Sequence, residues 1–385
     1  MSYDDGGPLG PGPGDELDEQ DQLQQPVSRV ARRQGQGRGR GRGRSSERVT
    51  RRGRIVVVLA GVVVLVVLAF GLWYELESHA LGASGPQVIV SVKPGESASA
   101  VADSLSGAHV IGSTLAFRLF DLVHGTPTIQ PGSYAFHTNE TFASVHSLLV
   151  AGPNVYAVDV NRGLTLHEVA TKVDDLPGHA SGSFAQIAAS GVVHSLYSPV
   201  GSDNLEGLLG TGAYIIRPGE SDATILTDMV QRFDRQAAVA GVNATSAAAL
   251  GLTPYQLVTV ASIVEKEGYI DKNMPDVARV VYNRLTQNTA LQMDATVLYS
   301  LGQDGGPVTP QDEQIHSPYN TYLNKGLPPT PICSPSPTAL HAAAHPPAGG
   351  WLFFELVQKD GTEAFADTFA EQLANEKLAQ QRGVG

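Results

Sequence analysis

The longest apolar stretch of the chain is the run IVVVLAGVVVLVVLAFGLWY at residues 55–74, which contains no charged residue. A helix of about 20 such residues is long enough to cross a hydrocarbon layer roughly 30 Å thick. Trp73 and Tyr74 close the run, and such aromatic side chains favour the interface between lipid and water. The pattern predicts one membrane-spanning helix over 55–74.

The charges on the two flanks of this run differ in sign. Four arginines precede it and two glutamates follow it: Arg48, Arg51, Arg52, Arg54, Glu75 and Glu77. Because basic residues remain on the cytoplasmic side, we expect a cytoplasmic N-terminus, residues 75–385 outside, and a plasma-membrane location. A cleaved signal peptide is excluded, since the apolar core is too long and the region before it is far too extended.

Beyond a short spacer at 75–86, one polar–apolar pattern occurs twice. VIVSVKPGESASAVADSL (88–105) and YAVDVNRGLTLHEVATKV (156–173) align without gaps. Each predicts an alternating strand, a glycine turn, a hydroxyl N-cap and a helix, and Thr165 with Glu168 matches a capping box. The similarity fits a true repeat or two independent strand–turn–helix units.

The segment between the two copies, residues 130–152, has the same pattern with Thr141 as the N-cap. These elements predict a small domain over 87–153 and a larger domain over 155–380. In pattern the small domain resembles a glycan-binding LysM-like module, although a structural spacer domain fits equally. The expected fold class is α+β, with a membrane anchor, a small LysM-like α/β module and a larger α+β catalytic domain.

Within the larger domain, the largest helix candidate spans 254–267. Its ends carry an N-cap, a first-turn proline, a capping-box glutamine and a terminal glycine: Thr253, Pro254, Gln256 and Gly268. A second amphipathic helix is expected over 274–286. The remaining pattern predicts an Ala-rich helix ending at Pro346, a strand in WLFFELV and a C-terminal amphipathic helix.

Charge is unevenly distributed along the chain. Residues 1–54 hold eleven arginines, no lysine and eight acidic residues, which leaves 15 basic and 30 acidic residues in 55–385. Because residues 55–385 are so acidic, they repel polyphosphates, and we do not expect nucleic acid as a partner. The Gly-, Pro-, Gln- and Arg-rich tail 1–54 is predicted to be disordered. Its RGRGRGR repeat could bind RNA or anionic lipid, but a flexible cationic flank is the simpler interpretation.

Cysteine and histidine usage argues against disulfides and metal sites. Cys333 is the only cysteine, so no internal disulfide or thiolate metal site is available. His341 and His345 are four residues apart, but a third ligand is not evident and an ordinary helix explains the stretch. We therefore expect no cofactor and no metal.

The stretch ASIVEKEGYI at 261–270 ends the long helix with two glutamates around a lysine. Residues two apart on a helix differ by about 200° in direction, so Glu265 and Glu267 cannot point into one site. A helical wheel predicts that Lys266 faces water and that four residues form the buried face: Leu257, Val260, Ala261 and Val264. A carboxyl group among apolar side chains has a raised pKa, which suits proton transfer and favours Glu267. Alternatively, both glutamates only keep the helix soluble.

Five motifs follow one another in this region: ASIVEKE (261–267), VARVVYNRL (277–285), LQMDATVLYSLG (291–302), SPYNTY (317–322) and GLPPTPI (326–332). Together they resemble the endolytic murein transglycosylases, the YceG-like family, and the resemblance covers roughly residues 55–380. It implies cleavage of the MurNAc–GlcNAc bond of peptidoglycan without water. One glutamic acid protonates the glycosidic oxygen and then deprotonates the C6 hydroxyl of the sugar, whereas ordinary glycosidases need two carboxylates.

By this resemblance Glu267 occupies the catalytic position. The motifs also imply substrate-binding residues, namely Gln292, Asp294, Tyr319, Asn320, Tyr322 and Glu206, and supporting residues, namely Glu265, Asn283 and Arg284. Asn283 and Arg284 also fit a structural hydrogen-bonding hub. The chain departs from the family at Gly268, where Thr or Ser is common, and in TPICSPSP, where Gly and Asn are more usual.

The resemblance further implies a role in limiting the length of nascent glycan strands. Peptidoglycan strands are then the substrate, and penicillin-binding proteins or glycan polymerases are the expected protein partners. Two alternatives remain at this point. One is a non-catalytic peptidoglycan-binding scaffold, and the other is a hydrolase that uses Glu267 with Asp294 or Glu206 as a second carboxylate.

Overall fold

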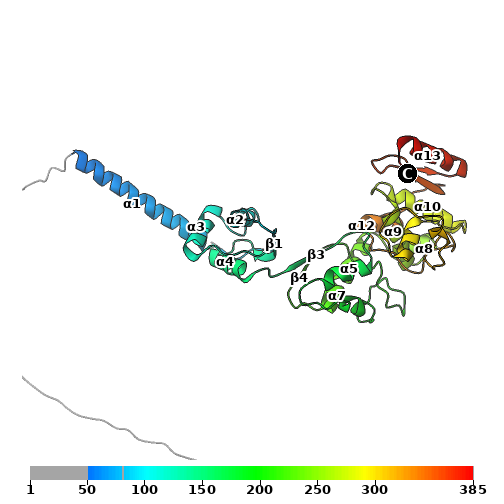
Figure 1. The fold of residues 1–385 in the computed structure, drawn as a ribbon, viewed down its shortest axis with the longest axis horizontal. Coiled ribbons are helices and arrows are strands. Elements are labelled where there is room, and N and C mark those ends of the chain that lie inside the picture. Colours follow the sequence, from blue (N-terminus) through cyan, green and yellow to red (C-terminus); the bar gives the residue numbers. More distant parts are fainter. Residues whose placement is uncertain (1–50, 80–81, 385) are drawn as a thin grey trace, which may run out of the picture. The chain divides into compact units, whose positions relative to one another are not determined.

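The computed structural model describes residues 51–79 and 82–384 (Figure 1). The predicted disorder of residues 1–50 therefore lies outside the described residues. Residues 51–54, which were predicted to belong to the disordered tail, are helical instead. Helix α1 spans Arg51–Ser78 and so also includes the first part of the predicted spacer. Its length and composition are those of a helix able to cross a membrane.

Residues 87–153 contain two strands and three helices. In chain order these are β1 (Gln87–Val92), α2 (Ala98–Gly107), α3 (Thr114–His124), β2 (Gly132–His137) and α4 (Phe142–Ala151). The strands pair antiparallel, with Val90 opposite Tyr134. One buried cluster includes Leu105, Phe117 and Phe136, so the helices cover the short sheet with apolar side chains.

The two similar segments form the predicted strand–turn–helix units. β3 (Tyr156–Val160) and α5 (Leu166–Asp174) are the second copy of β1 and α2. Gly95 and Gly163 have φ angles of 79° and 83°, which few other residues adopt without strain. Thr165 caps α5 and completes the predicted capping box with Glu168.

The first half of the larger region contains elements that the sequence patterns did not predict. They are α6 (Ser183–Ala188), β4 (Gly212–Ile216), α7 (Asp222–Val239) and α8 (Ala244–Ala249). β4 pairs antiparallel with β3, forming the two-stranded ribbon seen in Figure 1. At 18 residues α7 is longer than α9, so the prediction that 254–267 is the largest helix here was wrong.

The two helices nearest the glutamate pair, α9 (Pro254–Glu267) and α10 (Met274–Thr286), follow the predicted boundaries. α12 (Pro337–Ala344) is the expected Ala-rich helix and ends two residues before Pro346, whereas α11 (Asp294–Leu301) and the 3₁₀ turn at Asp312–Gln314 were not predicted. α9, α10 and α12 pack against one another (Figure 1). Because these neighbours surround α9, every residue from Leu257 to Glu265 is buried, and the one-sided apolar face expected from the wheel was wrong.

The described chain closes with a hairpin and a helix. β5 (Phe353–Leu356) confirms the expected strand, β6 (Glu363–Ala366) was not predicted, and α13 (Phe369–Arg382) is the expected C-terminal helix. β5 and β6 pair antiparallel, and α13 packs against both strands. This hairpin also reaches the segment that follows α9, and that contact positions part of the site.

Candidate active site

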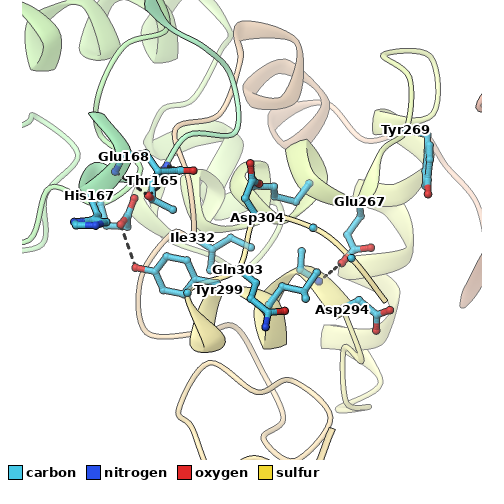
Figure 2. A pocket seen from close by; sticks show the side chains of 17 residues that line it. Thr165, His167, Glu168, Glu267, Tyr269, Asp294, Tyr299, Gln303, Asp304 and Ile332 are labelled. Carbon is cyan, nitrogen blue, oxygen red and sulfur yellow. Dashed lines mark hydrogen bonds and ion pairs between the residues drawn. The ribbon is translucent and has the colours of Figure 1, made fainter. Parts of the chain in front are cut away.

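A cavity of about 610 Å³ opens at the C-terminal end of α9, beside Glu267 (Figure 2). Its walls come from α5, α9, α11 and the glycine-rich segment 302–306. Figure 2 shows Glu267 and Asp294 on one side of the cavity, with Thr165 and Tyr299 on the other. The volume is in the range of pockets that hold small ligands or parts of larger ones.

Glu267 is held by the first turn of α11. Its Oε1 accepts a hydrogen bond of 3.0 Å from the backbone N–H of Ala295. The pKa of Glu267 is raised to about 7, chiefly by burial and also by the nearby carboxylates of Asp294 and Glu363, while the Ala295 bond and the Arg284 charge oppose the shift. Such a carboxyl group is able both to give and to accept a proton near neutral pH.

Glu265 faces a different environment, as the spacing of the two glutamates predicted. It is 8% exposed, its Oε2 accepts a 2.8 Å hydrogen bond from the Ser336 N–H, and its Oε1 lies 3.3 Å from Arg162 Nε. Burial raises its pKa, and the Ser336 bond and the Arg162 charge counteract this shift. Glu265 lines a separate, smaller cavity of about 310 Å³.

Lys266 corrects the helical-wheel prediction that this side chain points into water. Its side chain is only 23% exposed, and its Nζ lies 2.5 Å from Asp304 Oδ1. Both cavities are lined by Lys266, Tyr269 and Asp304. The wheel treats the helix as isolated, whereas here the segment after α11 covers this face of α9.

Asp294 and Tyr322 form the other polar contact near the acid. The Tyr322 hydroxyl donates a hydrogen bond of 2.5 Å to Asp294 Oδ1. Asp294 is exposed and lines the cavity, and it is the first residue of α11. Burial and the Asp294 carboxylate raise the pKa of Tyr322, so the phenol remains a proton donor.

Glu206 lines the cavity from a segment far away in the sequence. Its Oε1 accepts a 2.9 Å bond from the Leu166 N–H, and its Oε2 accepts a 3.1 Å bond from the Tyr299 hydroxyl. Burial raises the pKa of Glu206, and these hydrogen bonds work in the opposite direction. The arrangement ties the start of α5 to α11 across the cavity wall.

Residues 90–378 match the sequence profile of the YceG-like family. The chain belongs to the YceG-like family. The resemblance drawn from the five motifs is thereby confirmed.

Proteins from two bacterial genera that are similar to this YceG-like chain share one name. A Bacillus subtilis (strain 168) protein named "Endolytic murein transglycosylase" is 28% identical over 303 residues, which are 74% of this chain and 82% of that protein. A Streptococcus pneumoniae (strain ATCC BAA-255 / R6) protein of the same name is 24% identical over 331 residues, 77% of this chain and 60% of that protein. The chain thus spans about three fifths of the streptococcal relative.

One solved structure supports the fold. The crystal structure of a yceG-like protein from Listeria monocytogenes is 24% identical, with a TM-score of 0.54, and covers 75% of this chain and 98% of that one. The mixed α+β architecture is therefore confirmed, whereas the LysM-like assignment of 87–153 stays a prediction.

Four residues predicted to bind substrate in this YceG-like chain lie outside the cavity lining, namely Gln292, Tyr319, Asn320 and Tyr322, and Tyr322 contacts the lining residue Asp294. Asn320 is fully buried, and its Nδ2 donates to the carbonyls of Glu313 and Ile315 at 2.8 and 2.9 Å. The Tyr319 ring packs on Tyr299 with centroids 4.8 Å apart. Gln292 is exposed, with a φ of 50°. Asn320 and Tyr319 order the loop behind the cavity wall.

Asn283 and Arg284 form the structural hub that was one of the two interpretations of their motif. Asn283 Nδ2 donates to the carbonyls of Gly349 and Trp351 at 3.1 and 2.8 Å. Arg284 donates through Nε to the Leu352 carbonyl at 2.6 Å, and through Nη1 to the Leu291 carbonyl. α10 thereby anchors both the C-terminal hairpin and the start of α11, and the Arg284 charge also acts on Glu267.

Sequence reasoning missed part of the cavity. Tyr269, His167, Gln303 and Asp304 line it but were not singled out, and Thr165 with Glu168 was interpreted only as a helix cap. The sequence did offer one signal, because Tyr269 is an aromatic residue directly after EKEG. In the structure Tyr269 is 65% exposed. Among the described residues no group of three or more metal-ligating side chains occurs.

Proposed function

We propose that this chain is an endolytic peptidoglycan lytic transglycosylase that uses Glu267 as its acid and base. The observation that supports this proposal most directly is the Glu267 carboxyl group, whose pKa is raised to about 7, beside a cavity of about 610 Å³. The names of the Bacillus and Streptococcus relatives point to the same reaction class. Glu265, the other carboxyl group of the motif, faces Arg162 and a separate cavity.

In the proposed reaction, protonated Glu267 gives its proton to the oxygen between MurNAc and GlcNAc as the bond from C1 to that oxygen breaks. The GlcNAc end leaves as an alcohol. The C6 hydroxyl oxygen of the same MurNAc then bonds to C1, and its proton passes to the Glu267 carboxylate. The product is a 1,6-anhydro-MurNAc end, the acid is regenerated, and the intramolecular nucleophile replaces water.

The nearby polar groups have complementary roles in this proposal. Asp294, held by Tyr322, lies on the same side of the cavity as Glu267 and is placed to accept hydrogen bonds from sugar hydroxyls (Figure 2). The exposed ring of Tyr269 offers an apolar face to a sugar at the cavity rim. Glu206 fixes Tyr299 on the opposite wall.

The test is mass spectrometry of purified peptidoglycan incubated with the detergent-solubilised full chain, beside its Glu267→Gln variant. Anhydro-muramoyl ends from the parent alone would support the proposal. Reducing ends would instead identify a hydrolase, and Asp294→Asn or Glu206→Gln would then show which carboxylate is the second catalytic group. A folded parent that binds peptidoglycan without releasing fragments would favour the scaffold alternative.

We also propose that α1 anchors the chain with residues 75–385 outside the cytoplasm, because arginines precede the apolar run and glutamates follow it. Cys333 is buried and gives a low background for thiol labelling. A membrane-impermeant maleimide should label Ser84→Cys, at an exposed position, in intact cells and leave Ser45→Cys unlabelled. The reverse labelling pattern would exclude this orientation.

The two strands and helices of 87–153 are proposed to be a LysM-like module that binds glycan. The full chain carrying Glu267→Gln should cosediment with peptidoglycan, and deletion of 87–153 should weaken this binding while circular dichroism confirms that the remainder is folded. Unchanged binding would assign the region a spacer role.

Penicillin-binding proteins and glycan polymerases are proposed as partners, because the anchor would hold the cavity near emerging strands. Their absence after membrane crosslinking and purification would exclude them.

A further inference from the structure

Glu363, at the start of β6, is a buried carboxyl group that the proposed reaction does not use. It is 8% exposed, and its Oε1 accepts a long hydrogen bond of 3.4 Å from the Tyr269 N–H. Its Oε2 is fully enclosed and has no hydrogen-bond partner among the described residues. Such an unpaired buried oxygen is costly, so its retention calls for an explanation.

The hairpin that carries Glu363 is hydrogen-bonded to the segment directly after α9. Asn273 Nδ2 donates a 2.7 Å bond to the Gly361 carbonyl, and Lys272 Nζ donates a 2.9 Å bond to the Thr362 hydroxyl. Gly361 has a φ of 89°, and a Cβ there would lie 2.8 Å from Ile270 Cγ2. The segment 269–273 is therefore packed closely against the β5–β6 turn, and Glu267 is two residues before it.

The two carboxyl groups also interact through their charges. The Glu363 carboxylate raises the pKa of Glu267, as does Asp294. The pKa of Glu363 itself is raised to about 7 by burial and by Asp276, while the Tyr269 N–H and the nearby Asn273 amide oppose the shift. Two coupled acids that titrate in the same range lose their protons in two steps that belong to the pair.

The charged groups around this pair come from several elements. Asp276 on α10 raises the pKa of Glu363, and Arg284 on the same helix lowers that of Glu267. On α13, Gln372 donates a 2.9 Å bond to Glu355 of the same hairpin. The other ionisable groups of the segment after α9 are Tyr269, Lys272 and Asp271, and Asp271 pairs with Arg162. Those of the β5–β6 turn are Lys359 and Asp360.

We infer that Glu363 acts through Glu267 as a positioning residue: its carboxyl group braces the segment after α9 and keeps the proton on Glu267 until substrate takes it. This inference rests on the proposed function for its role in cleavage. After proton transfer to the leaving oxygen, a charged Glu363 also favours the return of a proton from the C6 hydroxyl to Glu267. Glu363 itself touches no reacting atom in this scheme.

The test measures the pair directly, without relying on catalysis. The full chain is labelled with ¹³C at glutamate side-chain carboxyl groups, and the Glu267 signal is identified by its absence in Glu267→Gln. In Glu363→Gln we expect the Glu267 titration midpoint to fall by roughly half a unit to one unit. The matched control is Glu355→Gln, a carboxyl-to-amide change on the same hairpin, for which the midpoint should stay in place.

An unchanged Glu267 midpoint in Glu363→Gln, or an equal shift in Glu355→Gln, would overturn the inference. If circular dichroism shows that Glu363→Gln does not fold, Glu363→Met is measured instead, because it also removes the charge and suits a buried position. The activity readout is the pH profile of kcat/KM for anhydro-end release. The apparent pKa of its high-pH limb should fall by the same amount as the NMR midpoint. A chain without cleavage but with the NMR shift would refute the proposed function while leaving the coupling intact.

Discussion

Glu265 is buried and Glu267 is partly buried at the end of the same helix, yet Glu265 contacts a cation while Glu267 has two carboxylates nearby. Glu265 faces Arg162 and accepts a hydrogen bond from Ser336. Glu267 accepts one backbone bond and has acidic neighbours, Asp294 and Glu363. Burial raises the pKa of both. The Arg162 charge lowers the pKa of Glu265 against Asp271, whereas Asp294 and Glu363 raise that of Glu267 against Arg284. The comparison teaches that the sign of the surrounding charge separates a structural carboxylate from a proton carrier.

The largest expected effect is on activity. Glu267→Gln should lower the rate of anhydro-end release by about 10²–10⁴-fold, because the amide cannot transfer the proton. Glu265→Gln should retain most of the parental rate, since its side chain lines a separate cavity. The measurement is fragment release from peptidoglycan, quantified by mass spectrometry, and equal losses in the two variants would break the comparison.

Stability should respond in the opposite order. Glu265→Ala leaves the buried Ser336 N–H without its acceptor, so we expect the free energy of unfolding to fall by about 1–3 kcal/mol. Glu267→Ala should cost less, because the Ala295 N–H lies beside the cavity, where water can reach it. Urea denaturation followed by circular dichroism gives both values, and a larger loss at Glu267 would contradict this account.

The pH dependence of stability should carry the signature of Glu267. Because its pKa is raised to about 7 in the folded chain, the folded state binds the proton more tightly than the unfolded state. Its contribution is therefore fully present below about pH 4.5 and is lost as pH rises through about 7, by roughly 3 kcal/mol. Urea midpoints from pH 4 to 8 should fall less in Glu267→Gln, and parallel curves would show that Glu267 is not the group responsible.

Gly268 has a packing reason for its departure from the family pattern. A Cβ at this position would lie 2.9 Å from Met274 Cγ and 3.0 Å from the Val264 carbonyl oxygen. Gly268→Ala should therefore destabilise the chain by about 1 kcal/mol and reduce activity through displacement of Glu267. Gly107→Ala, at a helix end with open space, is the control and should be neutral or slightly stabilising in thermal melts. Equal melting temperatures would argue against the packing explanation.

The smallest effect is expected at Lys266. It pairs with Asp304, whose side chain is 62% exposed, and such pairs contribute little in water. Lys266→Met should change the free energy of unfolding by less than about 1 kcal/mol and leave the Glu267 titration close to parental. A marked fall in the NMR midpoint of Glu267 would show that the charge of Lys266 also shapes the site.

Local signals explain why much of the fold was predictable. α9 begins where Thr253, Pro254 and Gln256 predicted, because caps and proline act within one turn. The repeated strand–turn–helix units depend on glycine turns and hydroxyl caps of the same local kind. By contrast β6 lacks a comparable pattern and is stabilised by pairing with β5 and packing against α13. α7 does begin at a hydroxyl cap, Ser221, and this local signal was missed.

The sequence by itself determined that only one glutamate of EKEG could enter the main cavity, because helical spacing sets the direction of each side chain. It also determined the apolar run of α1 and the motifs shared with the family. Only the tertiary structure decided that Lys266 is covered, that Asn320 orders a loop, and that Glu363 lies near Glu267. Lys266 and Asp304 are 38 residues apart in the chain, and Glu267 and Glu363 are almost a hundred residues apart, so local patterns carry no record of these contacts.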